Sequence, residues 1–281
     1  MSDDKKMNKI TLVPVGGLAN RMRAVAGAFN LAAQTGGALR VIWFRDWALR
    51  CPFGDLFRPM KYPNLTVKEA NAIDLLTFGR PRLRNGFVPR LFQNCLFDKA
   101  IYEREMDSLI RDGFDFASWA KNANVYMATY LPFGTLDDKL YRLLFKPVES
   151  IEEVVENRRR SFSDYNVGIH IRRTDNLRSI EHSPIELFCE KMDEEIELHA
   201  GVKFYLASDS EKDKQWLMER YGDRIVSSSK EAARNSIGGM KDAVADLYTL
   251  ASTQKIYGSF GSSFSEMAAQ LGGQPLRILK K

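Results

Sequence analysis

Hydrophobic residues alternate between strand and helix spacing at the start of the chain. Residues 9–15 (KITLVPV) form a mostly apolar run that predicts a buried strand, and Pro14 indicates that this strand ends there. Two glycines follow, and residues 20–34 then carry apolar side chains at helical spacing. Residues 38–44 (ALRVIWF) predict a second strand. This order is typical of the βαβ unit of a parallel sheet.

The second half of the chain repeats this alternation several times. The expected strands are residues 166–171, 202–207, 224–227, 255–259 and 275–279, and the expected helices are residues 149–162, 183–199, 212–221, 241–251 and 264–271. Such regular alternation predicts a doubly wound parallel sheet.

The stretch between these two parts is less periodic. Residues 46–145 are rich in aromatic residues, prolines and arginines, with a helical pattern at 67–76 and a strand pattern at 124–131. We expect an irregular α/β region with long loops, where substrate-binding segments usually lie. With a boundary near the helix that follows, the chain is predicted to form domains 1–150 and 151–281.

Composition narrows the class of protein. The chain has 281 residues, 44% of them apolar and 27% charged, which suits a folded protein of two ordinary domains. Three scattered cysteines and three histidines predict neither a disulfide framework nor a metal site. Because no signal peptide and no apolar run of membrane-spanning length is present, we expect a cytoplasmic protein.

Charge adds a weak indication of an anionic ligand, since the formal net charge is +5. No nucleic-acid-binding module or interleaved basic and aromatic stripe is present, so nucleic acid is not an expected partner. Residues 80–90 (RPRLRNGFVPR) contain four arginines. This segment fits an acidic acceptor, a membrane surface or a solvated loop, so peripheral membrane association stays open.

Ligands of an open α/β sheet bind beyond the carboxyl ends of its strands, so the residues that follow each strand are the candidates. After the first strand comes GGLANR, where glycines let a ligand approach and a helix N-terminus offers N–H groups to phosphate. Asn20 and Arg21 add side-chain donors there. The alternative is a plain βα turn without a ligand.

After the strand at 166–171 comes the basic sequence HIRRTD. Neighbouring strand residues point to opposite faces, so Arg172 shares a face with His170. A guanidinium fork suits a diphosphate because it bonds two oxygens at once and stays charged. We therefore expect Arg172 to bind a ligand and Arg173 to be structural, in a pair with Asp175 that fixes the loop.

Two further strands are followed by short polar turns. Asp209, in the sequence SDS, either accepts hydrogen bonds from a base or ribose or belongs to a helix N-cap. Gly261, Ser262 and Ser263, in the sequence FGSSFSE, form a second anion site or ordinary helix caps. The absence of a GxSxG elbow argues against a serine hydrolase.

Four segments together resemble the fucosyltransferase superfamily: the core α1,6-, nodulation, protein O- and bacterial α1,2-fucosyltransferases. They are residues 16–24 (GGLANRMRA), 170–175 (HIRRTD), 204–210 (FYLASDS) and 246–268 (DLYTLASTQKIYGSFGSSFSEMA). The resemblance does not extend over residues 50–145. It implies a GT-B-like α/β fold, in which two Rossmann-like domains with parallel sheets face each other across a cleft. The acceptor side would be 1–150 and the donor-binding side 151–281.

The resemblance also implies a role for each donor-side residue. Arg172 would bind the β-phosphate of GDP-fucose and stabilise the leaving group in place of a metal. His170 and Asp209 would contact the guanine or ribose. Phosphate would be held by Ser262 together with the backbone of its two neighbours, Gly261 and Ser263.

The remaining candidates would act around this centre. Asn20 and Arg21 would reach the donor from the other side of the cleft, and Asp175 would orient the arginines. Direct displacement also needs a base near the acceptor hydroxyl. Asp46 and Asp55 are candidates for that base only because they follow the second strand.

The expected function is therefore a metal-independent, inverting glycosyltransferase that moves fucose from GDP-fucose to a glycan acceptor. No cofactor is expected. Two alternatives remain: a transferase that uses another nucleotide sugar, and a protein of the same fold that binds a nucleotide or glycan without turnover.

Overall fold

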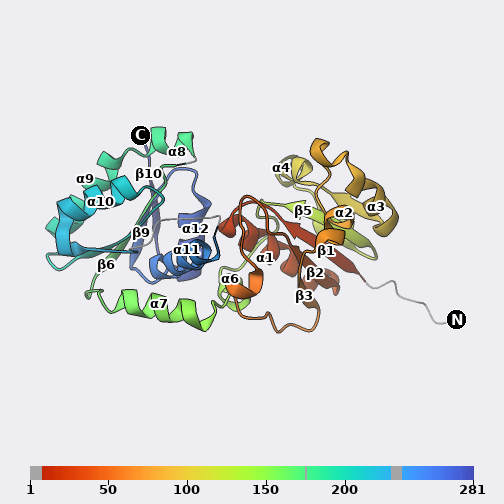
Figure 1. Cartoon of the computed structure of the whole chain (residues 1–281), viewed down its shortest axis with the longest axis horizontal. Helices are drawn as coiled ribbons and strands as arrows, with labels where there is room; N and C mark the ends of the chain where they lie inside the picture. Colours follow the sequence, from red (N-terminus) through yellow and green to blue (C-terminus); the bar gives the residue numbers. More distant parts are fainter. Residues whose placement is uncertain (1–7, 175, 229–235) are drawn as a thin grey trace. The chain divides into compact units, whose positions relative to one another are not determined.

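The computed structural model describes residues 8–174, 176–228 and 236–281 (Figure 1). The chain forms two compact units that divide between Lys146 and Pro147, and each unit contains one parallel sheet of five strands. The boundary expected between residues 150 and 151 lies just inside the helix that opens the second unit. We refer to the units as unit one and unit two.

In unit one the strand order is β3-β2-β1-β5-β4, and every pairing is parallel. The strands are β1 (Lys9–Pro14), β2 (Ala38–Trp43), β3 (Leu65–Glu69), β4 (Lys99–Ile101) and β5 (Asn124–Thr129). The helices are α1 (Leu18–Thr35), α2 (Ala72–Thr77), α3 (Val88–Leu96), α4 (Glu103–Arg111), α5 (Phe116–Ala120) and α6 (Lys139–Leu144), with 3₁₀ turns at Phe53–Asp55 and Leu83–Asn85. The central strand β1 carries the fully buried Ile10 and Leu12.

The helical pattern expected over residues 67–76 is wrong for its first part. Those residues complete β3, which pairs with β2. Helix α2 begins only after Asn71, whose side chain accepts a hydrogen bond from the backbone N–H of Asp74 at 3.0 Å, while Asp74 accepts from the Asn71 N–H at 2.9 Å. This reciprocal capping box fixes where the helix starts.

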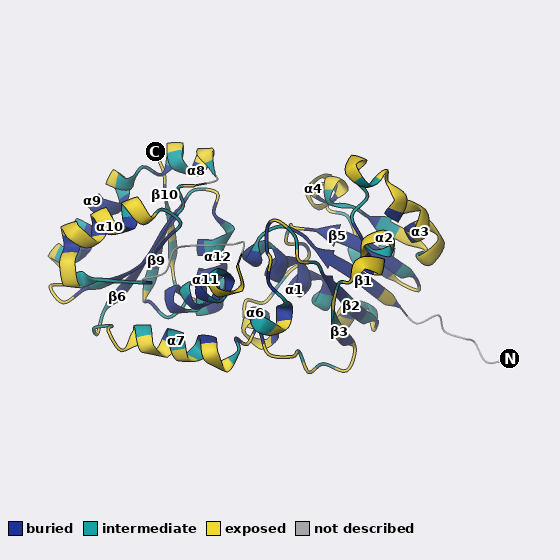
Figure 2. Ribbon diagram, in the orientation of Figure 1, coloured by how far each residue is buried: buried dark blue, intermediate teal, exposed yellow. Residues whose placement is uncertain are grey.

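In unit two the strand order is β10-β9-β6-β7-β8, again with parallel pairing throughout. The strands are β6 (Asn166–Ile171), β7 (Lys203–Ser208), β8 (Ile225–Ser227), β9 (Lys255–Ser259) and β10 (Leu276–Leu279). The helices are α7 (Glu149–Arg159), α8 (Leu177–His182), α9 (Ile185–Leu198), α10 (Glu211–Tyr221), α11 (Ile237–Leu250) and α12 (Ser263–Gly272), with a 3₁₀ turn at Gly222–Arg224. All six residues of β6 are buried, and Figure 2 shows the inner strands of both sheets largely in the colour of buried residues.

The strand order reverses direction at the centre of each sheet. In unit one the chain leaves β1 toward β2 on one side and returns to β5 on the other, and in unit two β6 and β9 have the same relation. The carboxyl ends of the strands at such a switch point form the crevice where ligands of open α/β sheets bind. The loops after β1 and β5, and those after β6 and β9, are therefore the places to look for a site.

Candidate functional site

The loop that follows β6 is held in place by the two neighbouring strands. The backbone N–H of Arg172 donates to Ser259 Oγ at 3.0 Å, and Ser259 is the fully buried last residue of β9. On the other side, the N–H of Arg173 donates to Asp209 Oδ1 at 2.6 Å. Thr174 donates to Asp209 Oδ2 from its N–H at 3.3 Å and from its hydroxyl at 2.7 Å. The backbone that carries Arg172 is thus fixed by groups at the carboxyl ends of β9 and β7.

Asp209 therefore has a contact that sequence reasoning did not predict. The helix cap in the SDS sequence is Ser210, which accepts a hydrogen bond from the N–H of Asp213 at 3.3 Å. Asp209 instead uses both carboxylate oxygens to hold the loop after β6. Contact of Asp209 with a base or ribose stays a prediction. Its partner lies 36 residues earlier in the chain, and no local pattern indicates such a pairing.

The two arginines of the loop lie in different surroundings. Arg173 Nε lies 3.4 Å from Asp213 Oδ2 on α10, and Arg173 Nη1 donates to the carbonyl of Ile180 on α8 at 3.4 Å. Arg173 thus joins the loop to two helices. Its expected partner, Asp175, lies outside the described residues. Arg172 is half-buried directly at the carboxyl end of β6, where the sequence predicted a ligand-binding guanidinium.

The first turn of α12 lies against the end of β6. The ring of Phe264 stacks on His170 with centroids 5.0 Å apart and an interplanar angle of 30°. Ser262, the buried N-cap of α12, makes no capping bond with its side chain, and its Oγ lies 3.5 Å from His170 Nδ1. Gly261 has a φ of +67°, which favours glycine. The N–H groups of a first helical turn have no intrahelical acceptor and suit an anion.

A glycine in β9 allows this close packing. A Cβ on Gly258 would lie 2.5 Å from Ser265 Oγ and 2.7 Å from Ser265 Cβ, so a larger residue would push α12 away from the sheet. Asn176 supports the same turn, because its Nδ2 donates to the carbonyl of Gly261 at 3.4 Å. The structure therefore brings together His170, Arg172, Gly261, Ser262 and Ser263 at the switch point of unit two.

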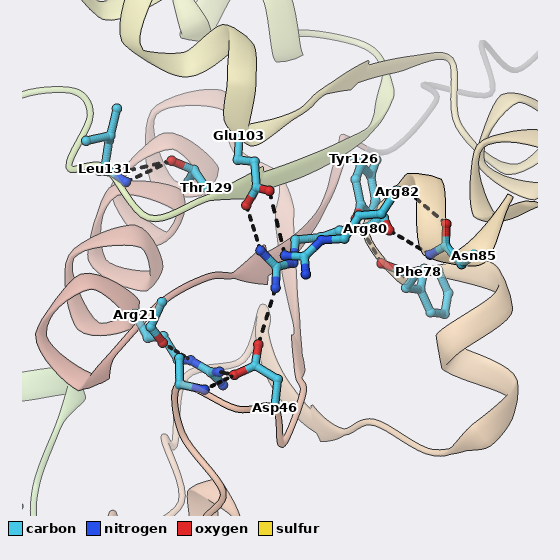
Figure 3. A network of polar contacts seen from close by, with 12 residues as sticks. Arg21, Asp46, Phe78, Arg80, Arg82, Asn85, Glu103, Tyr126, Thr129 and Leu131 are labelled. Atoms are coloured by element: carbon cyan, nitrogen blue, oxygen red, sulfur yellow. Dashed lines mark hydrogen bonds and ion pairs between the residues drawn. The ribbon is translucent and has the colours of Figure 1, made fainter. Parts of the chain in front are cut away.

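Unit one presents a different arrangement at its own switch point. Arg21 is fully buried, with Nε donating to the carbonyl of Gly16 at 2.8 Å and Nη1 to that of Phe44 at 2.5 Å. Its Nη2 forms an ion pair with Asp46 Oδ1 at 2.8 Å (Figure 3). Burial lowers the pKa of Arg21 to about 10, and the Asp46 carboxylate opposes that shift. Arg21 therefore remains a cation near neutral pH.

The ion pair extends into a network. Asp46 Oδ2 lies 3.4 Å from Arg80 Nη2, and Arg80 Nη1 lies 2.7 Å from Glu103 Oε2 (Figure 3). A contact between Arg21 and a ligand, which the sequence predicted, would require this network to open. Asp46 was a candidate base only by position. Its carboxylate contacts two guanidinium groups, so a role as base would also require the network to open.

The other two unit-one candidates lie near the carboxyl ends of β1 and β2, and their roles stay predictions. Asn20 is half-buried in the first turn of α1, with Nδ2 3.2 Å from the position that a Cβ on Gly16 would take. Asp55 ends a 3₁₀ turn. The part of the chain that the structure describes has no helix long and apolar enough to cross a membrane.

Comparisons of the chain with known proteins give different results by sequence and by structure. No family model matches the chain, and no curated protein matches it. Solved structures do match. A NodZ α1,6-fucosyltransferase soaked with GDP-fucose superposes with a TM-score of 0.65 at 19% identity, over 95% of this chain and 93% of that one. A mutant of Arabidopsis thaliana FUT1 in complex with GDP gives 0.68 at 16% identity, over 99% and 71%.

A third match is POFUT1 in complex with GDP, with a TM-score of 0.60 at 13% identity over 98% of this chain and 99% of that one. The chain has the fucosyltransferase fold. The GT-B-like α/β class expected from the four sequence segments is thereby confirmed, with one parallel sheet in each unit. The fold includes residues 50–145, which the sequence resemblance did not reach.

Proposed function

We propose that the chain is a glycosyltransferase that moves fucose from GDP-fucose to a glycan acceptor. One observation carries this proposal: the fixed loop of Arg172 and the first turn of α12 meet at the switch point of unit two. The same fold occurs in fucosyltransferases solved with GDP and GDP-fucose, which supports a guanine nucleotide as the ligand.

The chemistry of the site suits a diphosphate. The guanidinium of Arg172 offers a planar pair of donors to phosphate oxygens. The first turn of α12 adds backbone N–H groups and the positive end of its dipole, with Gly261 and Ser262 allowing close approach. His170, stacked on Phe264, is our candidate for contact with the nucleoside.

In the proposed reaction the acceptor oxygen forms a bond to the anomeric carbon as the bond to the β-phosphate oxygen breaks. The electron pair leaves with GDP, and the acceptor proton passes to a base or to solvent. Arg172 stabilises the charge that grows on the departing phosphate, which is the part a divalent metal has in other transferases. We therefore infer a metal-independent displacement with inversion at the anomeric carbon.

The test is calorimetric titration of GDP, GDP-fucose and UDP in the presence of EDTA, with wild type, Arg172→Ala and Arg160→Ala. Arg160 is an exposed residue at the end of α7, which precedes the amino end of β6, so its removal changes the charge equally at the opposite edge of the sheet. We expect GDP binding that survives EDTA, falls at least about tenfold in Arg172→Ala and is unchanged in Arg160→Ala.

Other outcomes would overturn parts of the proposal. Absence of guanine nucleotide binding would remove the GDP-fucose donor, and a preference for UDP would favour another nucleotide sugar. Binding that requires a divalent ion would contradict metal independence. GDP binding together with no release of GDP from GDP-fucose in a screen of glycan acceptors would favour a binding protein without turnover.

A further inference from the structure

Two helices of unit one bury polar side chains and expose apolar ones. In α3 the buried positions are Pro89 and Gln93. Gln93 Nε2 donates to the carbonyl of Gly79, and Gln93 Oε1 accepts from the hydroxyl of Tyr102, at 2.9 Å each. In α2 the buried residue is Asp74, paired with Lys68 Nζ at 2.7 Å. An ordinary surface helix has the reverse pattern. The inward faces are thus satisfied by hydrogen bonds and ion pairs, and the apolar faces are left outside.

The exposed side chains form one apolar face over α2, the turn that follows and α3. On α3 they recur at helical spacing: Val88, Leu91, Phe92, Cys95 and Leu96. On α2 and the turn they are Ile73, Leu75, Leu76, Leu83 and Phe87. Of the eighteen large apolar side chains exposed in the described residues, nine belong to this face, and Figure 2 shows α2 and α3 largely as exposed ribbon. Such a concentration marks a binding surface.

Backbone strain singles out the turn between the helices. Phe87 has a φ of +55° directly after Gly86 at +56°, and a bulky residue in this left-handed region costs about 1 kcal/mol. Phe87 is nevertheless 41% exposed, so burial of its ring does not offset that cost. Strain of this kind is retained where the conformation serves a function. Here the conformation holds an aromatic ring outward beside the apolar residues of α3.

The exposed charge within this segment is positive. Residues 71–97 contain four arginines and one acid, Asp74, which is buried and paired. Arg80 and Arg82 pair with Glu103 at 2.7 Å and 3.7 Å. Arg84 and Arg90 are exposed beside the apolar side chains. No exposed acid in the segment opposes them, so the face combines apolar side chains with a basic border.

We propose that this apolar face binds the surface of an anionic lipid bilayer. Leu, Phe and Val side chains would enter the boundary between headgroups and acyl chains, while Arg84 and Arg90 bind anionic headgroups. A second copy of the chain suits the face less well. A two-fold contact through it would bring the arginines of both copies into one interface without an exposed acid from the segment to pair with them, and like charges there repel. The inference does not depend on the proposed transferase activity.

Flotation of the full chain with vesicles tests this directly. We expect binding to phosphatidylcholine vesicles that contain phosphatidylserine, with weaker binding at high salt and on phosphatidylcholine alone. The double variant Leu91→Gln/Phe92→Gln should weaken partition about a hundredfold, because both side chains lose their apolar burial. Arg84→Gln should weaken it about fivefold. The matched control is Leu177→Gln/Leu198→Gln, which changes two leucines of unit two that are at least as exposed as Leu91 and Phe92, and it should have no effect.

Two results would overturn the proposal. One is failure of the wild-type chain to float with phosphatidylserine vesicles, or an equal loss in the control variant. The other is a concentration-dependent dimer in sedimentation that Leu91→Gln/Phe92→Gln abolishes, without vesicle binding, which would make a second copy the partner. Because the assay contains no nucleotide, its outcome is independent of whether the chain binds GDP.

Discussion

Both units place the first strand of their sheet at its centre, but they hold the loops at the carboxyl edge of that strand in different ways. In unit one the carboxyl edge contains the buried network of Arg21, Asp46 and Arg80. In unit two the loop at that edge is held mainly through backbone N–H groups, with the Arg173–Asp213 ion pair beside them. A second ionic cluster lies at the amino edge. There Glu195 accepts from Lys255 at 2.7 Å and from the hydroxyl of Tyr257 at 2.6 Å.

Two arginines at similar positions in the two sheets illustrate this difference. Arg21 and Arg172 both follow the central strand of their sheets, after β1 and β6. The guanidinium of Arg21 is bound by its own unit, whereas the loop of Arg172 is held by hydrogen bonds from its backbone. Residue type and position after the central strand therefore do not decide how each loop is held. From these contacts we propose a stabilising role for Arg21 and a ligand-binding role for Arg172.

The largest effect is expected from Arg21→Met. Removing this buried cation takes one ion-pair partner from Asp46 and the side-chain donor from two carbonyls, which should cost about 3–5 kcal/mol of unfolding free energy. Urea unfolding followed by tryptophan fluorescence measures this, with Arg104→Met, an exposed residue of α4, as the control. Near-normal stability together with lost GDP binding would support the ligand contact of Arg21 that the sequence predicted. It would contradict a stabilising role for Arg21.

A smaller effect is expected from Asp209→Ala, which releases Arg173 and Thr174. We expect GDP and inorganic pyrophosphate to bind about ten- to a hundredfold more weakly, because the loop must then be ordered on binding. Asp209→Asn should lie between, and Asp223→Ala, an exposed acid before β8, should change nothing. Weaker GDP binding with unchanged pyrophosphate binding would instead indicate that Asp209 contacts the nucleoside.

The smallest effect concerns Glu195 at the amino edge of unit two. Burial alone would raise the pKa of Glu195, but hydrogen bonds from Lys255 and Tyr257 outweigh it and the pKa is lowered. The folded state thus binds fewer protons than the unfolded state. The contribution of Glu195 to the free energy of unfolding is complete above the ordinary carboxyl pKa and is lost as the pH falls through the lowered pKa. Glu195→Gln should cost about 1 kcal/mol at neutral pH, less in acid, with GDP affinity unchanged.

Urea unfolding of wild type and Glu195→Gln across pH provides the measurement. A difference in unfolding free energy between wild type and Glu195→Gln that grows toward acid would contradict a lowered pKa of Glu195. Weaker GDP binding in this variant would show that the cluster at the amino edge of the sheet affects the proposed site at the carboxyl edge, which we do not expect.

The sequence predicted the alternation of strands and helices in unit two because its apolar periodicity is regular and its turns are short. The residues directly after β6 and β9 could also be named, since ligand positions in open α/β sheets follow strand ends. The contacts of Asp209 with Thr174 and of Ser259 with Arg172 could not be predicted, because they join segments 35 and 87 residues apart. The exposed apolar face of α3 could not be predicted, because the spacing of its apolar residues is the same as in a helix that buries its apolar face.

The most direct test of the central claim is hydrogen exchange of the full chain with and without GDP. We predict that GDP slows amide exchange in peptides that cover residues 170–174 and 259–265, and that Arg172→Ala removes this protection. Protection confined to residues 16–21 of unit one, or its persistence in Arg172→Ala, would contradict a nucleotide site at the ends of β6 and β9.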